Sequence, residues 1–339
     1  MSCNMRPSRK PVMAKERNLG LDAVKGLLIV LVVFGHLIEP FVDRAPVYKA
    51  VWAAIYVFHM PLFVILAGMF SKDILTGRDY ESLVQRLLLP LIVFQALYLV
   101  PIYATKGVLP HPVLQPHWIL WFLLSLATWR ILLPHLVRIQ GVLPLAVLVA
   151  ILTGYVEGIG YAFSLSRTLY FLPFFMLGFS QGQRLLIWAK GHMRYSIGLL
   201  LVPLSLAVVG VNFGLAHSLL YGSMSYTLTG PHFLEPGLER GIIIGLSIAA
   251  SIGFAGLAQR PIPAAVYLGQ RSLTIFVVHG FVVVGFGKLW KVLELGPSVP
   301  LLLAHAGVAL AAAFTLARLD SLFNAIFDWM GKRISLGCR

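Results

Sequence analysis

Charged residues are scarce in this chain of 339 residues: 12% are Asp, Glu, Lys or Arg, whereas 58% are hydrophobic. A soluble domain of this length could not cover so much apolar surface with so few charges. The composition therefore excludes an ordinary soluble protein and predicts a polytopic membrane protein. The net charge of +14 then reflects the excess of Lys and Arg on the inner side of a membrane, and we expect no nucleic-acid partner.

Cysteine is nearly absent as well. Cys3 and Cys338 lie near the two ends of the chain, so the sequence predicts neither a disulfide framework nor a metal site. The Walker loop, the GxSxG elbow, the HExxH motif and the CxxC pair are all missing. Their absence argues against ATP-driven, serine-hydrolase, zinc-protease and thiol-redox chemistry.

Long apolar runs are abundant, and ten of them reach roughly the length that crosses a bilayer as a helix. They fall at approximately 21–42, 50–71, 87–104, 118–134, 141–156, 168–186, 196–215, 241–258, 272–290 and 298–318. The sequence therefore predicts an all-α, polytopic bundle of about ten transmembrane helices. The first run has no small-residue cleavage site after it, so we interpret it as a span rather than a removed signal peptide.

The positive charges predict the orientation. With the N-terminus inside, 20 of the 27 Lys and Arg residues fall on the inner side and 7 on the outer side. We expect a basic cytoplasmic segment over 1–18, a membrane domain over 19–318 and a cytoplasmic amphipathic tail over 319–339. In the tail, Leu319, Leu322, Phe323, Ile326 and Met330 recur at helical spacing, which is typical of a helix lying on the inner leaflet.

The first apolar run carries His36, an imidazole that is costly in a membrane and therefore marks a candidate functional site. Lys25 precedes it by eleven residues, which places both side chains on one helix face about 16 Å apart. Glu39 follows one turn later, where it can orient or charge-stabilise the ring. The alternatives are a core histidine bonded to a carbonyl, a snorkelling lysine and a solvated Glu39.

Several cations gather at the inner ends of the first three spans. Arg17 and Asp22 lie near Lys25, and Arg86 opens the segment RLLLP, which ends at Pro90. Such cations can hold the phosphates of a cytoplasmic donor. The competing interpretation is attraction to lipid headgroups.

Other candidates are single residues within the apolar runs. His59 precedes Pro61, and His279 ends the segment SLTIFVVH; each lines a cavity or is an ordinary structural histidine. Trp118 and Trp121 form either an interface belt or a stacking wall for the substrate. Arg167 is a cation at an outer helix end, where the charge bias disfavours one, and so is a candidate for binding the acceptor.

The longest outer connection, about 216–240, contains Tyr221, Tyr226, His232, Glu235 and Glu239. These groups could contact a polar acceptor, but we favour a solvated loop.

Six segments together resemble acyltransferase family 3, in its fucose 4-O-acetylase-like branch, over about residues 17–318. They are LDAVKGLLIVLVVFGH (21–36), FHMPLFVILAGMFS (58–71), RLLLP (86–90), HWILWFLL (117–124), YFLPFFMLGF (170–179) and LGQRSLTIFVVH (268–279). The resemblance implies O-acetylation of a carbohydrate or related polar acceptor by cytoplasmic acetyl-CoA, with His36 as the essential histidine.

This chain departs from the family pattern in three places. Many members carry arginine where this chain has Lys25, which keeps the cation but loses the bidentate geometry. A common pair of arginines is reduced here to Arg86. The extra extracellular hydrolase-like domain of longer members is missing, so the membrane domain itself would meet the acceptor.

The resulting hypothesis is an acyl-CoA-dependent O-acetyltransferase in a bacterial cytoplasmic membrane, multi-pass and without a metal. His36, supported by Glu39, would act as general base, because histidine titrates near neutral pH. Lys25, Arg86, Arg17 and Asp22 are the candidate donor-binding residues. His59, Trp118, Trp121, Arg167 and His279 are candidates for binding a carbohydrate or glycolipid of the cell envelope. A glycan or glycolipid transporter without chemistry is the alternative.

Overall fold

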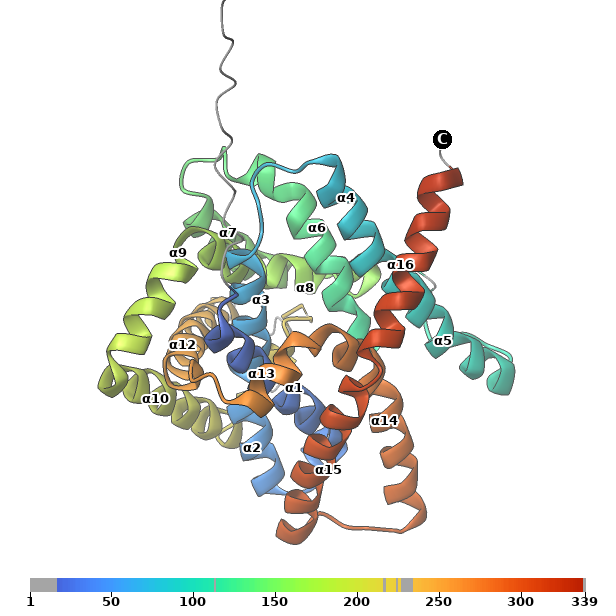
Figure 1. Ribbon diagram of the computed structural model, residues 1–339. Coiled ribbons are helices and arrows are strands. Elements are labelled where there is room, and N and C mark those ends of the chain that lie inside the picture. The colour runs from blue at the N-terminus through green and yellow to red at the C-terminus, as the bar shows by residue number, and fades with distance from the viewer. Residues whose placement is uncertain (1–16, 113, 216–217, 224, 227–233, 338–339) are drawn as a thin grey trace, which may run out of the picture.

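The protein is described here from a computed structural model covering residues 17–112, 114–215, 218–223, 225–226 and 234–337. Within these ranges the chain forms helices joined by turns, with no β-strand (Figure 1). The longer helices are α1 (Leu19–Ile38), α2 (Pro46–Tyr56), α3 (His59–Met69), α5 (Leu89–Lys106), α6 (Trp121–Leu136), α7 (Val142–Leu152), α9 (Leu172–Gly191), α10 (Met193–Asn212), α12 (Glu235–Ala258), α14 (Ser272–Val292), α15 (Val299–Ala317) and α16 (Asp320–Gly337). The shorter ones are α4 (Gly77–Leu83), α8 (Leu165–Tyr170), α11 (Ser218–Tyr221) and α13 (Pro263–Gln270).

Eight helical segments in the described ranges are long and apolar enough to cross a membrane. A ninth is the pair formed by 162–170 and α9, which is bent by 48°. Together with the shorter helix Val142–Tyr155, these segments coincide with the ten apolar runs of the sequence. The all-α polytopic bundle is thus confirmed, whereas the count of ten spans and the side of each terminus stay predictions.

Helix α1 is held against α13 at a close backbone crossing. The Asn18 side chain caps its first turn by accepting a hydrogen bond from the Leu21 N–H, at 3.2 Å. At the crossing, a Cβ on Gly26 would overlap the Ala265 carbonyl, and a Cβ on Gly269 would overlap the Asp22 carbonyl. Small residues let membrane helices approach this closely. The crossing fixes the helix that carries both Lys25 and His36.

A second close crossing joins α3 and α9. A Cβ on Gly68 would overlap the Phe175 carbonyl, and one on Gly178 would overlap the Ile65 carbonyl. Before this crossing, the chain breaks its helical path at residues 57–58, between α2 and α3. Tyr56, just before the break, contacts His36, and Met60, just after it, lines the same space as His36.

The segment RLLLP (86–90) lies inside a continuous helical stretch and does not end a helix. Residues Val84–Leu88 form a π-helical turn that connects α4 to α5, and Pro90 lies in the first turn of α5. Proline is tolerated there because the first helical N–H groups have no intrahelical partner. The π turn, which is often found at functional sites, carries Arg86.

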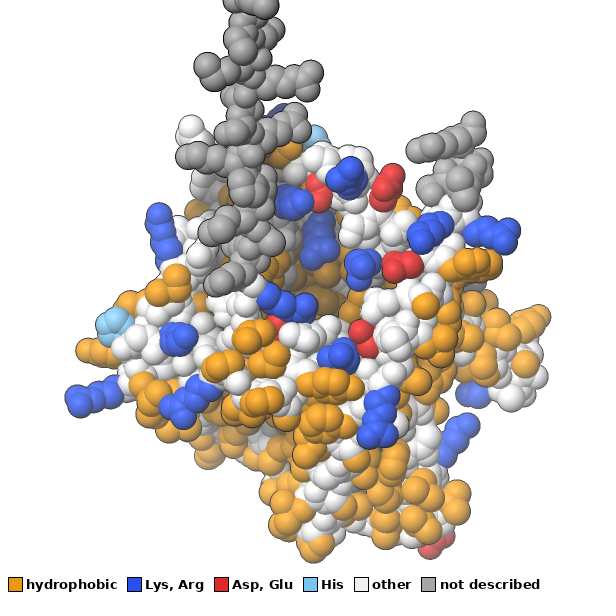
Figure 2. All heavy atoms as spheres, viewed as in Figure 1, with side chains coloured by type: hydrophobic (Ala, Val, Ile, Leu, Met, Phe, Trp, Pro, Cys, Tyr) orange, Lys and Arg blue, Asp and Glu red, His pale blue; other side chains and the backbone are white. Residues whose placement is uncertain are grey.

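The C-terminal helix α16 packs on the bundle through part of its apolar surface. Phe323 and Phe327 are buried, and Phe323 lies 6.3 Å from Phe94, between ring centroids. Leu322 and Ile326 of the predicted stripe remain exposed. The inner-leaflet position of this helix stays a prediction. Lys and Arg side chains gather over the upper part of the face seen in Figure 2, and hydrophobic side chains dominate its lower part.

Candidate active site

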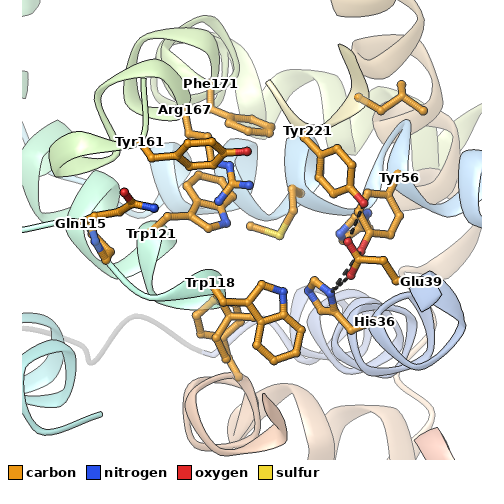
Figure 3. Close-up of a pocket in the computed structure, with 16 residues that line it drawn as sticks. His36, Glu39, Tyr56, Gln115, Trp118, Trp121, Tyr161, Arg167, Phe171 and Tyr221 are labelled. Carbon is orange, nitrogen blue, oxygen red and sulfur yellow. Dashed lines mark hydrogen bonds and ion pairs between the residues drawn. The ribbon is translucent and has the colours of Figure 1, made fainter. Parts of the chain in front are cut away.

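His36, near the end of α1, stands in a cluster of polar side chains. Its Nδ1 lies 2.9 Å from Oε2 of Glu39 and 3.2 Å from the Tyr56 hydroxyl. The Tyr56 hydroxyl also donates to Oε2 of Glu39 at 3.4 Å, and the Tyr221 hydroxyl donates to Oε1 at 2.5 Å. Figure 3 shows these four residues on one side of a cavity. Glu39 is therefore held by three separate groups.

This arrangement determines the tautomer of the histidine. An ionised carboxylate has only acceptors, so the hydrogen bond between His36 and Glu39 requires a proton on Nδ1. The neutral ring then carries its lone pair on Nε2, the nitrogen that Glu39 does not occupy. The His36 side chain is 14% exposed. A proton taken up by the neutral ring would therefore bind at Nε2, and the Glu39 carboxylate would stabilise the imidazolium so formed.

Aromatic rings hold His36 from its other sides. The Trp118 ring meets it edge-on at 4.9 Å and the His279 ring stacks on it at 5.5 Å, both between centroids. Trp118 has a φ of 44°, a strained conformation for a bulky residue, and such strain concentrates at functional sites. His279 is buried and its Nδ1 bonds the Phe276 carbonyl at 2.6 Å. It supports the ring of His36 and is not among the residues that line the cavity.

The cavity has a volume of about 290 Å³ and is lined by His36, Glu39 and the predicted residues His59, Trp118, Trp121 and Arg167. The Arg167 guanidinium lies between two rings, 5.2 Å from Trp121 and 5.4 Å from Tyr161. In Figure 3 it faces the histidine cluster from the opposite wall. His59 lines the cavity while its Nδ1 bonds the Ile55 carbonyl at 2.9 Å. A cation, a base and stacking rings thus surround one small space.

A second cavity, of about 300 Å³, lies beside the first. Its lining includes Lys25, Arg86 and Arg130. The Arg130 Nε is buried and has no hydrogen-bond partner among the described residues. Met60 and Phe276 line both cavities. The cationic cavity and the histidine cavity are therefore neighbours, separated by these two side chains.

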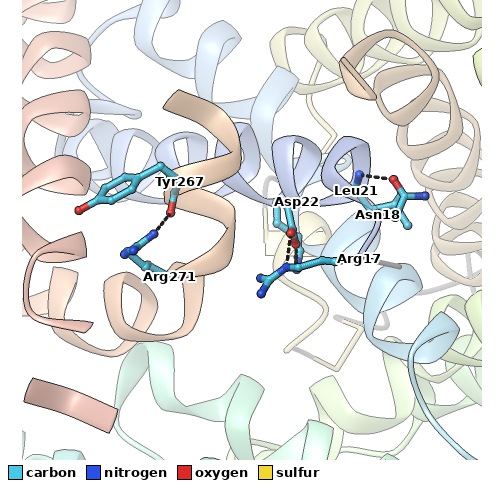
Figure 4. A network of polar contacts seen from close by, with 7 residues as sticks. Arg17, Asn18, Leu21, Asp22, Tyr267 and Arg271 are labelled. Atoms are coloured by element: carbon cyan, nitrogen blue, oxygen red, sulfur yellow. Dashed lines mark hydrogen bonds and ion pairs between the residues drawn. The ribbon is translucent and has the colours of Figure 1, made fainter. Parts of the chain in front are cut away.

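The remaining predicted donor residues form an ion-pair cluster at the start of α1 (Figure 4). Asp22 is buried and lies 2.5 Å from the Arg17 Nε and 2.6 Å from the Lys25 Nζ. The single carboxylate of Asp22 thus offsets part of the positive charge of both cations. Arg17 and Asp22 are not among the residues that line the second cavity, whereas Lys25 is. Among the described residues, the ion pair of Asp22 with Lys25 is what links this cluster to that cavity.

Several site residues were not identified from the sequence. Tyr56 and Met60 look like ordinary members of an apolar run, and Arg130 like one more inner-side charge. The solvated-loop interpretation of the outer connection is wrong for Tyr221, which bonds Glu39, and for Tyr226, which is buried and donates to the Ile151 carbonyl at 2.9 Å. His232 lies outside the described residues. Among the described residues, no group of three or more His, Cys, Asp or Glu is placed to hold a metal ion.

Comparison with known proteins identifies the family to which the sequence is similar. A family model described as an acyltransferase domain matches residues 18–318. The chain is 26% identical over 324 residues to the nodulation protein NolL of Sinorhizobium fredii (strain NBRC 101917 / NGR234), covering 82% of each chain. It is 25% identical over 327 residues to the nodulation protein NolL of Mesorhizobium japonicum (strain LMG 29417 / CECT 9101 / MAFF 303099), covering 83% of this chain and 82% of the relative. No solved structure matches.

Proposed function

The chain belongs to acyltransferase family 3 and is a multi-pass membrane acyltransferase, and from this premise we propose that its donor is acetyl-CoA and its acceptor a hydroxyl of a cell-envelope carbohydrate or glycolipid. The observation that carries the proposal is the pair of adjoining cavities, one with three cations and one with His36. Charged donor phosphates need the first, and proton transfer from a hydroxyl needs the second.

The donor would enter the cationic cavity from the cytoplasmic side. Lys25, Arg86 and Arg130 line this space and would hold the phosphates of CoA. Lys25 and His36 lie on the same helix, eleven residues or about 16 Å apart. The pantetheine arm would cross this distance and bring the thioester between Met60 and Phe276 to the histidine.

The acceptor would occupy the histidine cavity. As its hydroxyl oxygen attacks the thioester carbon, Nε2 of His36 takes the hydroxyl proton and Glu39 stabilises the imidazolium. The carbon–sulfur bond then breaks, and the CoA thiolate leaves and recovers the proton from His36. The products are an acetyl ester and CoA–SH. Trp118, Trp121 and Arg167 would orient the acceptor by stacking and charge.

The test is release of free thiol from acetyl-CoA by the purified, detergent-solubilised protein, in the presence of crude cell-envelope glycans. We expect glycan-stimulated release by wild type and none by His36→Ala, with unchanged thermal stability as the folding control. If well-folded wild type neither binds CoA nor releases thiol, the enzyme proposal fails and the transporter alternative takes its place.

A further inference from the structure

A third space opens on the same histidine. A groove of about 890 Å³ is lined by His36, Glu39 and Trp118 and continues along the last turns of α14. It shares these three residues with the histidine cavity. The cationic donor cavity is lined by none of them. The groove is therefore a path to the base that does not pass through the donor cavity.

The walls of this groove carry an excess of positive charge. Three cations, Arg44, Lys288 and Lys291, line it against two carboxylates, Glu294 and the Glu39 that bonds His36. All three cations are exposed. Among the described residues, no carboxylate forms an ion pair with Lys288 or Lys291. Their charges are thus available to a ligand.

The excess of Lys and Arg expected on the inner side of a membrane does not account for these cations. The orientation predicted from the sequence places only 7 of the 27 Lys and Arg residues on the outer side. Arg44, Lys288 and Lys291 are three of those seven, and Arg167, in the histidine cavity, is a fourth. More than half of the outer cations therefore line the two spaces that reach His36.

We propose that this groove binds an anionic group, a phosphate or a carboxylate, carried by the acceptor itself. The inference rests on the proposed function and narrows its acceptor to a negatively charged saccharide. A cleft with an excess of positive charge, walled by apolar helices, concentrates ligands of the opposite sign. The anion would sit between Arg44, Lys288 and Lys291, and the sugar would extend past Trp118 with a hydroxyl at His36.

Outer-leaflet lipid phosphates share this chemistry and are the other source of an anion. The two sources differ in what they change. A lipid phosphate would affect every acceptor equally and would depend on the lipid. An acceptor-borne anion would affect only charged acceptors, whatever the lipid.

The experiment divides envelope oligosaccharides by anion exchange into a neutral and an anionic fraction. Transfer of labelled acetyl is measured in phosphatidylcholine vesicles with and without added anionic lipid. The proteins compared are wild type, the double variant Lys288→Gln/Lys291→Gln and the control Lys106→Gln, which removes a cation outside the groove. We expect the double variant to raise the half-saturating concentration of the anionic fraction by about three- to tenfold. Its maximal rate and its KM for acetyl-CoA should stay unchanged, and Lys106→Gln should behave like wild type.

Added salt should weaken wild-type use of the anionic fraction in the same direction. Equal use of the neutral fraction, or a double variant that matches wild type, would overturn the inference. So would an effect that appears only in vesicles containing anionic lipid and is the same for both fractions.

Failure of the inference is distinguishable from failure of the proposed function. Binding of the anionic fraction to His36→Ala, followed by tryptophan fluorescence, reports on the groove without any turnover. Binding that is weakened by about the same factor on adding Lys288→Gln/Lys291→Gln supports the groove even when no transfer is detected. If neither fraction is acetylated in a His36-dependent way, the enzyme proposal fails, while the binding measurement still decides whether the groove holds an anion.

Discussion

The Nδ1 atom of His36 lies 2.9 Å from Oε2 of Glu39, and this contact leaves Nε2 as the basic nitrogen. Glu39→Gln keeps the size of the side chain but removes its charge and allows the amide to donate to the ring. We expect kcat to fall by about 10²- to 10⁴-fold, because the imidazolium loses its stabilising partner. The KM for acetyl-CoA should change little. The measurement is the steady-state rate of thiol release.

Glu39→Asp is the informative companion. It keeps the charge and shortens the reach to the ring, so part of the activity should return relative to Glu39→Gln. If both variants had nearly the wild-type rate, Glu39 would neither orient the His36 ring nor stabilise its protonated form.

The Tyr221 hydroxyl, on the short helix α11, holds the other oxygen of Glu39. Burial and then the neighbouring carboxylate raise the pKa of Tyr221 above its ordinary value. Its phenol therefore stays protonated, and donates, through neutral and mildly alkaline pH. Tyr221→Phe should lower kcat by about three- to thirtyfold, as for loss of a hydrogen bond to a charged group. The loss should be the same at pH 6 and at pH 9.

Tyr226→Phe is the matched control, because that hydroxyl donates to the Ile151 backbone carbonyl and neither residue lines the histidine cavity. It should change stability more than rate. A Tyr221→Phe effect that vanishes at pH 9 would show that the phenol ionises there, against the expectation.

Arg130 and Arg86 line the donor cavity, so replacing either with Ala should weaken the binding of the donor and not that of the acceptor. We expect the KM for acetyl-CoA to rise by about tenfold in each case, as for loss of one charge-assisted contact to phosphate. The KM for the acceptor should not change. Arg138→Ala removes an exposed cation just after α6 that is not among the cavity residues, and it should leave both constants unchanged. If Arg138→Ala raised the KM for acetyl-CoA as much, Arg86 and Arg130 would act by general electrostatic attraction of the donor and not by direct contact.

The sequence predicted the helices better than the site. Hydropathy is the signal of a membrane span, so each apolar run lies on one helix or on two consecutive helices. His36 and Glu39 were identified because a polar pair at helical spacing is costly there. Tyr221 lies 182 residues from Glu39 along the chain, and no local pattern reports that contact. Tyr56 and Arg130 are common residue types for their positions, and only the packing of helices gives them a role.

Gly26 tests the crossing that positions α1. A methyl group there would overlap the Ala265 carbonyl. At Gly245, on α12, the described residues place no atom within 4 Å of the added carbon other than the backbone of the same helix turn. Gly26→Ala should destabilise the protein by about 1–3 kcal/mol or more. Gly245→Ala should be neutral or stabilising by up to about 1 kcal/mol, because alanine favours a helix. The measurement is the fraction of protein that remains monodisperse after heating; equal loss for both variants would contradict the close crossing.

Among the described residues, Met60 and Phe276 alone line both the donor and the histidine cavities, so the proposed transfer predicts that the thioester passes between them. Met60→Trp fills this boundary and should lower transfer by about a hundredfold, while acetyl-CoA still binds from the cationic side with an unchanged Kd. Met60→Ala should open the boundary and raise thiol release without acceptor, because water would reach the thioester. Met193→Trp, on the exposed surface of α10, controls for the bulk of the new ring. Loss of acetyl-CoA binding together with transfer in Met60→Trp would place the donor on the histidine side of the boundary. The assignment of the donor to the cationic cavity would then be wrong.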